Sequence, residues 1–407
     1  DGGKNWQNVT PSKLLGGGRV DAVEPSPHDP AKAYFSVLRY QLGDDKPYLY
    51  KTSDYGKKWE LLTDGTNGIP IDCPTRVIRE DPSLPDLLYA GTDCGLFISL
   101  NGGKSWESFQ QNLPITPVTD IKVYRDDLVI STMGRGFWVL DNLTPLYAPN
   151  FGLHTTQLYK PKDTYRMKYP KTGGDLYPRP AMFFDYFIAD SVNTPIRLEI
   201  ENAAGETLNT FVSDKWDVTD TIGNMDLSST TYLLDQSLAK SVGYHRFKWD
   251  MRHLGPWDVR DRRTYKNGPQ VASGDYCVKL TVGETVSIQN FTLLTDPRIL
   301  SLGVTEAEIQ QQEALGLELI KLLTEVRKYI HGLEQEKKSA QGARLEYIQA
   351  QLDSFVMEEG IYMQPKIINQ IEYLYASING PDQLPSRDAY ARFSKLKALV
   401  ESTKSEN

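Results

Sequence analysis

The chain has 407 residues, of which 40% are hydrophobic and 24% are charged, so its composition is that of a folded protein of two or three domains. Its formal net charge of −8 is spread along the sequence, which argues against a nucleic-acid partner or an anionic membrane surface. No apolar run reaches the roughly 18–20 residues that cross a bilayer, and the three cysteines form no zinc-type cluster, so we expect no transmembrane segment, metal or cofactor.

A short pattern that ends in tryptophan occurs three times in the first third of the chain, with its tryptophans 53 and 47 residues apart. The full pattern is Ser/Thr-x-Asp/Asn-x-Gly-x-x-Trp. In a tight hairpin the Asp or Asn side chain accepts backbone N–H groups, the Gly takes a positive φ, and the Trp covers the edge of the sheet. The pattern therefore predicts a folding device and not a catalytic one. Its positions are Asp1, Gly3, Trp6, Asp54, Gly56, Trp59, Asn101, Gly103 and Trp106.

Strand-like segments precede the second and third copies of this pattern, at 20–23, 33–37, 48–51, 76–79, 87–92 and 95–99. A period near 50 residues with several short strands per unit is typical of β-propeller blades. We therefore predict that residues 1–148 are the C-terminal blades of a propeller. Because two full blades cannot close a ring, we expect the remaining N-terminal blades in the same precursor or in a separate chain.

These turns resemble the Asp-box, or bacterial neuraminidase, repeats of sialidases, sortilin-type propellers and two-propeller xyloglucan hydrolases. Segments 76–82, 88–92 and 134–141 look most like the large sortilin-like repeat proteins of Bacteroidetes, some of which are described as glycosyl hydrolase-like. The resemblance covers essentially the whole chain. It implies an immunoglobulin-like domain and a helical tail after the propeller, and a secreted, outer-membrane or cell-surface location.

Cys73 and Cys94 flank two of the expected strands. If these strands form an antiparallel hairpin that turns near Ser83 and Leu84, the two cysteines lie opposite one another, where a disulfide can form. The alternative is two unrelated small buried residues. A disulfide would support an oxidising, extracytoplasmic compartment.

The repeat stops near residue 148, and a segment rich in Pro, Lys and Tyr, 149–180, is predicted as a linker with a first strand region. Alternating segments at 196–200, 244–250, 276–282 and 286–292 then predict an antiparallel immunoglobulin-like β-sandwich over 181–298. Cys277 lies within this alternation, so we interpret it as a core thiol and not as a nucleophile.

Residues 299–407 are predicted to form a helical bundle. Thr305 and Glu308 form a capping box ahead of a stripe of apolar residues that runs from Leu315 to Leu333 at helical spacing. Three further stripes follow, the last through Tyr390, Phe393, Leu396 and Leu399. Four such segments are most simply an antiparallel bundle, with a partner-binding coiled coil as the alternative.

Few residues of the sequence suggest chemistry. The candidate ligand-binding residues are charged residues of the propeller segment: Arg76, Arg79, Glu80, Asp93 and Arg135. A sialidase needs an arginine cluster and a tyrosine nucleophile, and other glycosidases need two carboxylates at a defined separation. The sequence does not place such groups around one substrate. Segment 79–81 is more typical of a strand-end ion pair, and segment 134–136 of a turn that enters a strand.

The predicted fold is thus multidomain and mainly β: a partial Asp-box propeller, a sandwich and a helical bundle. Our first hypothesis is an extracytoplasmic binding or scaffold protein, non-catalytic in this portion, that takes a protein, peptide or glycan ligand in an envelope or cell-surface assembly. The second is a sialidase-like or xyloglucanase-like propeller glycoside hydrolase whose catalytic acids lie partly outside this chain.

Overall fold

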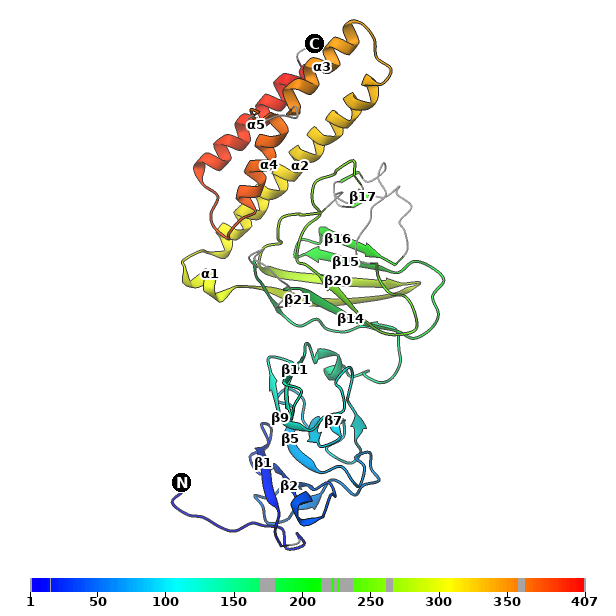
Figure 1. Ribbon diagram of the computed structural model, residues 1–407, viewed down its shortest axis with the longest axis vertical. Helices are drawn as coiled ribbons and strands as arrows, with labels where there is room; N and C mark the ends of the chain where they lie inside the picture. Colours follow the sequence, from blue (N-terminus) through cyan, green and yellow to red (C-terminus); the bar gives the residue numbers. More distant parts are fainter. Residues whose placement is uncertain are drawn as a thin grey trace. The chain divides into compact units, whose positions relative to one another are not determined.

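The computed structural model describes residues 2–14, 16–168, 180–213, 221–222, 225–226, 237–260, 266–357 and 363–405. The chain divides into two compact units, Asp1–Pro149 and Asn150–Asn407. The first unit consists of β-sheets, and the second contains further sheets followed by helices (Figure 1). The protein is therefore mainly β, with several sheets and a helical C-terminal region.

Three antiparallel meanders make up the first unit, and each has its strands in sequence order. The first contains β1 (Arg19–Pro25), β2 (Ala33–Leu38), β3 (Leu49–Thr52) and β4 (Glu60–Leu61). The second contains β5 (Thr75–Glu80), β6 (Leu88–Thr92), β7 (Gly95–Ser99) and β8 (Glu107–Ser108). The third contains β9 (Val118–Tyr124), β10 (Asp127–Thr132) and β11 (Phe137–Leu140). Short 3₁₀ helices span Tyr40–Leu42 and Thr144–Tyr147.

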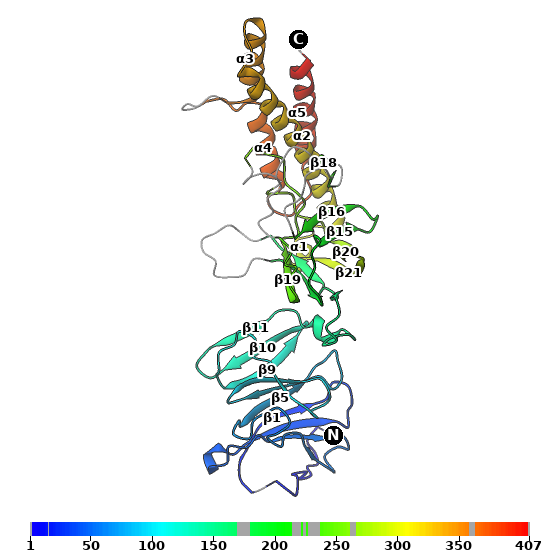
Figure 2. The same ribbon diagram turned by 90° about the vertical axis from the view of Figure 1, so that its right-hand side faces the viewer.

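The first strands of the three meanders, β1, β5 and β9, are neighbours (Figure 2). The middle sheet is buried on both faces, because β5, β6 and β7 are almost entirely inaccessible. Its packing against the third sheet is so close that a Cβ on Gly91 would lie 2.6 Å from Val77 and 2.8 Å from Val118. Sheets that bury each other in this way require small or flat side chains at the contact.

The first and third sheets each leave apolar side chains exposed. On β1, Val20 and Val23 are 52% and 65% exposed, and on β11, Phe137 and Val139 are 83% and 56% exposed. Phe137 and Val139 alternate with Trp138, which lies opposite Ile130 of β10, so they occupy the face of the third sheet away from its buried core. The middle sheet has no comparable exposed face.

The second unit begins with two sheets that share one hydrophobic core. The three-stranded sheet contains β12 (Gln157–Leu158), β14 (Met182–Ile188) and β19 (Gly243–Trp249). The five-stranded sheet contains β13 (Thr164–Arg166), β21 (Thr285–Thr295), β20 (Gly274–Val282), β15 (Arg197–Asn202) and β16 (Thr207–Val212). A separate two-stranded pair is β17 (Thr221–Ile222) with β18 (Met225–Asp226).

The alternation of apolar and polar side chains along the strands explains this core. Phe184 and Tyr186 of the smaller sheet and Leu198 and Leu280 of the larger one are at most 1% exposed, and they all belong to the same cluster. The pairing is antiparallel throughout except for β13, which runs parallel to β21. Strands of period two with one apolar face favour two packed layers, as the sequence pattern predicts.

The described residues from 297 to 405 form five helices: α1 (Pro297–Ser301), α2 (Glu306–Lys337), α3 (Ala343–Phe355), α4 (Ile367–Ile378) and α5 (Arg387–Ser405). The capping box at the start of α2 is confirmed, because Thr305 Oγ1 accepts the Glu308 N–H at 3.3 Å and Glu308 Oε2 accepts the Thr305 N–H at 2.8 Å. The predicted stripe on α2 is buried over its full length, from Leu315 to Leu333.

The four long helices form three rods, because α3 and α4 lie one after the other along α2. Helix α3 lies beside the C-terminal part of α2: its Arg344 bonds Glu336 of α2 at 2.7 Å, and its Gln351 bonds Tyr329 of α2 at 3.1 Å. Helix α4 lies beside the N-terminal part of α2: its Glu372 bonds Arg327 of α2 at 2.7 Å, and its Ile378 carbonyl accepts from Gln312 of α2 at 2.7 Å. Helix α5 returns beside them, since Gln351 donates to the Thr403 carbonyl at 2.8 Å.

The apolar stripe predicted for the last helix is partly wrong. Leu396 is 1% exposed, but Tyr390 and Leu399 are 39% and 41% exposed. The buried positions of α5 are Ala389, Leu396, Val400 and Thr403. Both the predicted and the observed buried positions recur every three or four residues, so spacing alone fits either set. The observed set faces α4 and α2 because its smaller side chains allow α5 to lie closer to these helices.

Candidate functional site

The two Asp-box turns in the described residues share one hydrogen-bond pattern and join the third and fourth strands of a sheet. In the first, Thr52 Oγ1 accepts the Gly56 N–H at 3.0 Å and Asp54 Oδ1 accepts the Lys58 N–H at 2.8 Å. In the second, Ser99 Oγ accepts the Gly103 N–H at 2.9 Å and Asn101 Oδ1 accepts the Ser105 N–H at 3.0 Å. Gly56 and Gly103 have φ of 83° and 92°. The hydroxyl and one side-chain oxygen of each motif accept backbone N–H groups within the turn, which supports a folding role.

The three tryptophans of the pattern have different surroundings. Trp106 is 3% exposed and donates through Nε1 to the Leu62 carbonyl at 3.2 Å, which links the second sheet to the first. Trp59 stacks edge-on against Phe35, with 4.6 Å between ring centroids. Trp6 is 87% exposed and bonds only locally, to the Gly3 carbonyl at 2.8 Å. Asp1 lies outside the described residues.

Arg76 and Asp93 form an ion pair at one end of the β5–β6 hairpin. The Arg76 side chain is 8% exposed, and its guanidinium lies over the Tyr40 ring at 5.8 Å from the centroid. A guanidinium that is buried, paired and stacked is committed to holding neighbouring segments together. The geometry of this pair favours a structural role.

Arg79 connects the first strands of all three sheets. Its Nη1 lies 3.4 Å from Glu24 Oε2 of β1, and its Nη2 donates to Asp120 Oδ1 of β9 at 2.7 Å. Its Nε also donates to the Ile121 carbonyl at 3.0 Å. We call Glu24, Arg79 and Asp120 the charged row. Its members come from sequence positions 24, 79 and 120 and meet because β1, β5 and β9 are neighbours.

The charged row is partly accessible, and its two carboxylates differ. The side chains of Arg79 and Glu24 are 20% and 21% exposed, whereas that of Asp120 is 63% exposed. Burial raises the pKa of Glu24 above its usual range, and repulsion from Glu80 and Asp120 adds to this effect, while Arg79 and Lys122 act against it. The row thus combines a carboxyl that retains its proton to higher pH with an exposed second carboxylate.

Glu80 faces the other way and is 3% exposed. Its Oε1 accepts from Lys32 Nζ at 3.3 Å and from the Asp86 N–H at 3.1 Å. Burial lowers the pKa of Lys32, but its bonds and proximity to Asp86 and Glu80 outweigh burial and raise that pKa overall. Glu80 Oε2 and Tyr34 Oη are buried without a hydrogen-bond partner in the structure. Burial is the main cause that raises the pKa of Tyr34 strongly, and the nearby negative charge of Glu80 raises it further. This cluster lies between the first and second sheets and is not open to a large ligand.

Arg135 lies apart from the other predicted residues, in the exposed turn between β10 and β11. Its N–H donates to Thr132 Oγ1 at 3.1 Å, and its carbonyl accepts from Trp138 Nε1 at 3.0 Å. Of the five sequence candidates, the structure pairs Arg76 with Asp93, places Glu80 in a buried cluster with Lys32, and brings Arg79 into a partly accessible group with two further acids. Sequence reasoning missed Glu24 and Asp120, although both lie in alternating strands and either could have been included as an outward-facing acid.

Cys73 and Cys94 form a disulfide, with 5.7 Å between their Cα atoms. The intervening hairpin turns between Glu80 and Leu88, which face each other in the β5–β6 register, so the two ends of the hairpin meet at the cysteines. Cys73 is buried in the core between the first two sheets. Cys277 is a free thiol of intermediate burial beside Glu201 and does not belong to the sandwich core, so its interpretation as a core residue is wrong. Burial and the charge of Glu201 raise its pKa, so it is a poor nucleophile.

No group of three or more His, Cys, Asp or Glu side chains in the described part of the chain could hold a metal ion. None of its helices, as far as they are described, is both long enough and apolar enough to span a membrane. His253 approaches Glu313 at 2.5 Å and His28 approaches the Asp81 carbonyl at 2.7 Å. Each of these histidines has a partner that fixes its ring.

No protein-family model and no curated protein matches the chain. Among solved structures, it is similar to a GH74 enzyme from Niastella koreensis at 12% identity and a TM-score of 0.25, over 67% of this chain and 46% of that one. A GH74 xyloglucanase from Xanthomonas campestris matches at 10% identity and a TM-score of 0.23, over 65% of this chain and 38% of that one. An ancestral GH74 enzyme matches at 12% identity and a TM-score of 0.21, over 68% and 35%.

The chain thus spans less than half the length of each of these enzymes. These structural neighbours are glycoside hydrolases of one family, GH74. At such TM-scores the likeness carries no argument about the fold or activity of this chain, and its function rests on its own geometry.

Proposed function

We propose that this chain belongs to an extracytoplasmic β-propeller protein that binds a polar ligand along the charged row. The observation that carries the proposal is Arg79, which joins Glu24 and Asp120 across three neighbouring first strands. In a propeller the first strands of the blades surround the central axis, so the row would line the channel. A protein, peptide or glycan with hydroxyl or cationic groups suits two carboxylates around one guanidinium.

The burial of the three sheets supports the propeller. The middle sheet has neighbours on both faces, whereas the first and third sheets expose Val20, Val23, Phe137 and Val139. Side chains of this kind on a sheet face are typically covered by another sheet. We therefore propose further blades as partners of both faces, from the same precursor or a separate chain. The Cys73–Cys94 disulfide supports a secreted or cell-surface location.

The exposed face of the third sheet gives a first test. The purified 407-residue chain is expected to self-associate with rising concentration, and replacing Phe137 and Val139 by lysine is expected to yield monomers. Sedimentation velocity measures both. Because both side chains are more than half exposed, each change should alter the free energy of unfolding by only about 0.5 kcal/mol.

Val286 and Ile288 of β21 are a matched control pair, since they alternate on a strand of the second unit and are 51% and 59% exposed. Their replacement by lysine should leave the self-association unchanged. A monomeric wild-type chain, or equal effects of the two pairs, would contradict the proposed blade contacts.

Glycoside hydrolysis is the second candidate function, and the raised pKa of Glu24 favours it. A general acid must hold its proton at the working pH, and a second carboxylate must act as base or nucleophile. In this reading Glu24 is the acid and Asp120 is the second group. The activity would be present below the pKa of Glu24 and would fall as the pH rises through it.

One experiment separates the two functions. A panel of oligosaccharides and peptides is screened against the full chain for binding by calorimetry and for turnover by product analysis, with Glu24→Gln and Asp120→Asn as variants. Ligand binding without turnover, weakened about tenfold or more by Asp120→Asn, is expected from the binding proposal. Turnover that Glu24→Gln lowers by about 100-fold or more would instead establish hydrolysis.

Glu107→Gln is the control, because Glu107 is an exposed acid on β8, outside the charged row. It should change neither binding nor turnover. If no compound binds, or if Glu107→Gln weakens binding as much as Asp120→Asn, the charged row is not the site.

A further inference from the structure

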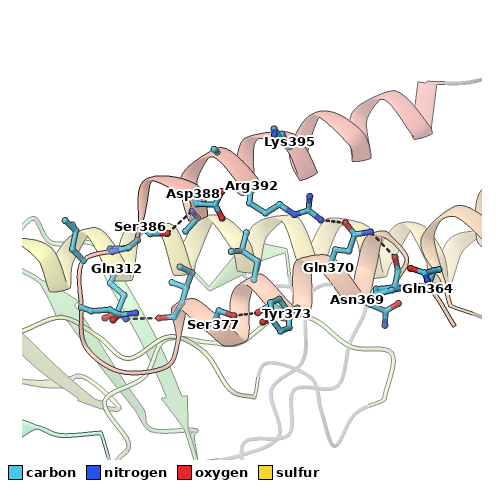
Figure 3. A pocket seen from close by; sticks show the side chains of 18 of the residues that line it. Gln312, Gln364, Asn369, Gln370, Tyr373, Ser377, Ser386, Asp388, Arg392 and Lys395 are labelled. Atoms are coloured by element: carbon cyan, nitrogen blue, oxygen red, sulfur yellow. Dashed lines mark hydrogen bonds between the residues drawn. The ribbon is translucent and has the colours of Figure 1, made fainter. Parts of the chain in front are cut away.

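The helical region contains a groove of about 1160 Å³ between α4 and α5, with Gln312 of α2 and Leu374 of α4 among its lining residues (Figure 3). It is open to solvent. Some apolar side chains of the groove lining are exposed to solvent. Tyr373 of α4 is 78% exposed, and Leu384, in the connection between α4 and α5, is 46% exposed. Apolar side chains this exposed at the lip of a groove are available to a partner.

The charges of the groove are mainly positive. Its charged lining residues are Arg392 and Lys395 on one side of α5 and Asp388 in the first turn of that helix. A carboxylate in a first turn already interacts favourably with the helix N-terminus, so Asp388 offsets the two cations less than its formal charge suggests. The groove therefore suits a partner that carries carboxylates.

Arg392 lies across the groove and donates a hydrogen bond to Gln370 of α4 (Figure 3). Gln370 is neutral, so replacing it by a carboxylate exchanges a weaker hydrogen bond for a charge-assisted one. By contrast, the nearby Arg327 is already paired with the carboxylate of Glu372 at 2.7 Å. Arg392 is thus the guanidinium in this region that gains most from an acidic partner.

The shape of the bundle indicates the kind of partner. Helix α2, the α3–α4 succession and α5 provide three rods, and the groove runs beside α4, whose 12 residues span about 18 Å. Two helices side by side present a trough for a further helix, as in a four-helix bundle. The occupant would cover about three turns.

We propose that the α4–α5 groove binds an amphipathic helix of a partner protein, with apolar side chains against Tyr373 and Leu384 and carboxylates against Arg392 and Lys395. This interaction is independent of the charged row in the first unit.

The test uses the full chain and two synthetic helices. Both are lactam-stabilised 15-residue peptides with leucines at i, i+3, i+4 and i+7, flanked by glutamates in one and lysines in the other. Fluorescence anisotropy is expected to show the glutamate peptide binding at least tenfold more tightly. In the variant Arg392→Glu with Lys395→Glu, the preference is expected to reverse.

Lys397→Glu is the matched control, since Lys397 is an exposed cation of α5 outside the groove lining. It should leave the preference intact, and circular dichroism should show unchanged helix content in all variants. Failure of both peptides to bind, equal binding of both, or a reversal by Lys397→Glu would overturn the proposal. So would a dimer of the chain that Arg392→Glu with Lys395→Glu dissociates, because a second copy would then be the occupant.

Discussion

Replacing Asp382 by alanine is expected to lower the free energy of unfolding of the second unit by about 3–5 kcal/mol. Asp382 Oδ2 lies 3.0 Å from Arg166 Nη1, and its Oδ1 lies 2.9 Å from Lys168 Nζ. The side chains of Arg166 and Asp382 are 2% and 3% exposed. Without the carboxylate, the Arg166 guanidinium would lose its charged partner in an almost fully buried site, and the ammonium of Lys168, whose side chain is 20% exposed, would also lose its charged partner.

The remaining contacts of this cluster show why the loss is not local. Arg166 lies at the end of β13 and donates through Nε to the Val271 carbonyl at 2.8 Å, and Lys168 donates to the Gly380 carbonyl at 2.7 Å. Asp382 belongs to the connection between α4 and α5. The cluster therefore links the sheet edge, the 266–272 segment and the connection between the helices.

The pH dependence of this variant provides a second measurement. Burial lowers the pKa of Lys168 in the folded protein, opposed by Asp382. The unfolded chain then binds more protons than the folded one in the interval below the ordinary lysine pKa, so stability rises with pH there. Removing Asp382 should lower that pKa further. The destabilisation by Asp382→Ala should accordingly be smaller at pH 9.5 than at pH 7.

Urea unfolding followed by circular dichroism measures both effects. Glu334→Ala is the control, because Glu334 is an exposed carboxylate of α2, and its change should stay within about 0.5 kcal/mol. A double variant, Arg166→Met with Asp382→Leu, should recover part of the stability, since an apolar pair of similar size replaces the buried ions. Equal stabilities of Asp382→Ala and Glu334→Ala would show that the cluster is not buried.

Loss of the Cys73–Cys94 disulfide is the second large expected effect, a fall of about 3 kcal/mol in the free energy of unfolding of the first unit. The bridge joins residues 21 positions apart and limits the freedom of the unfolded hairpin. Cys73 is also 1% exposed within the core shared by the first two sheets. Urea unfolding of the Cys73→Ser, Cys94→Ser variant, followed by tryptophan fluorescence, measures the change.

Cys277→Ser distinguishes loss of the bridge from loss of any thiol, because Cys277 is the free cysteine of β20. It should leave the unfolding of the first unit unchanged, and a reducing agent should affect the wild type but not the Cys73→Ser, Cys94→Ser variant. Three titratable thiols in the denatured, unreduced wild type would contradict the disulfide and, with it, the argument for an extracytoplasmic location.

Local patterns in the sequence predict much of this fold. The strand segments around residues 76–79, 95–99 and 276–282 lie within β5, β7 and β20, because alternation of apolar side chains is a property of each strand alone. The turn chemistry of Asp54 and Asn101 is equally local, since each accepts an N–H four residues ahead.

The charged row could not be predicted in the same way. Glu24, Arg79 and Asp120 are far apart in the chain, and only the order of the three sheets brings them together. The succession of α3 and α4 along α2 is also a tertiary property, because the length of each apolar stripe does not say which neighbour it covers. Tyr390 shows the same limit on a smaller scale, since its spacing fits a core position that Ala389 occupies.

Arg79 has a consequence for how this surface can change in evolution. One guanidinium is bonded to an acid on each side and to the Ile121 carbonyl, so a mutation at any member alters the environment of the other two. Specificity at this surface would thus shift through coupled substitutions, and homologues with a different residue at position 79 should differ at positions 24 and 120 as well.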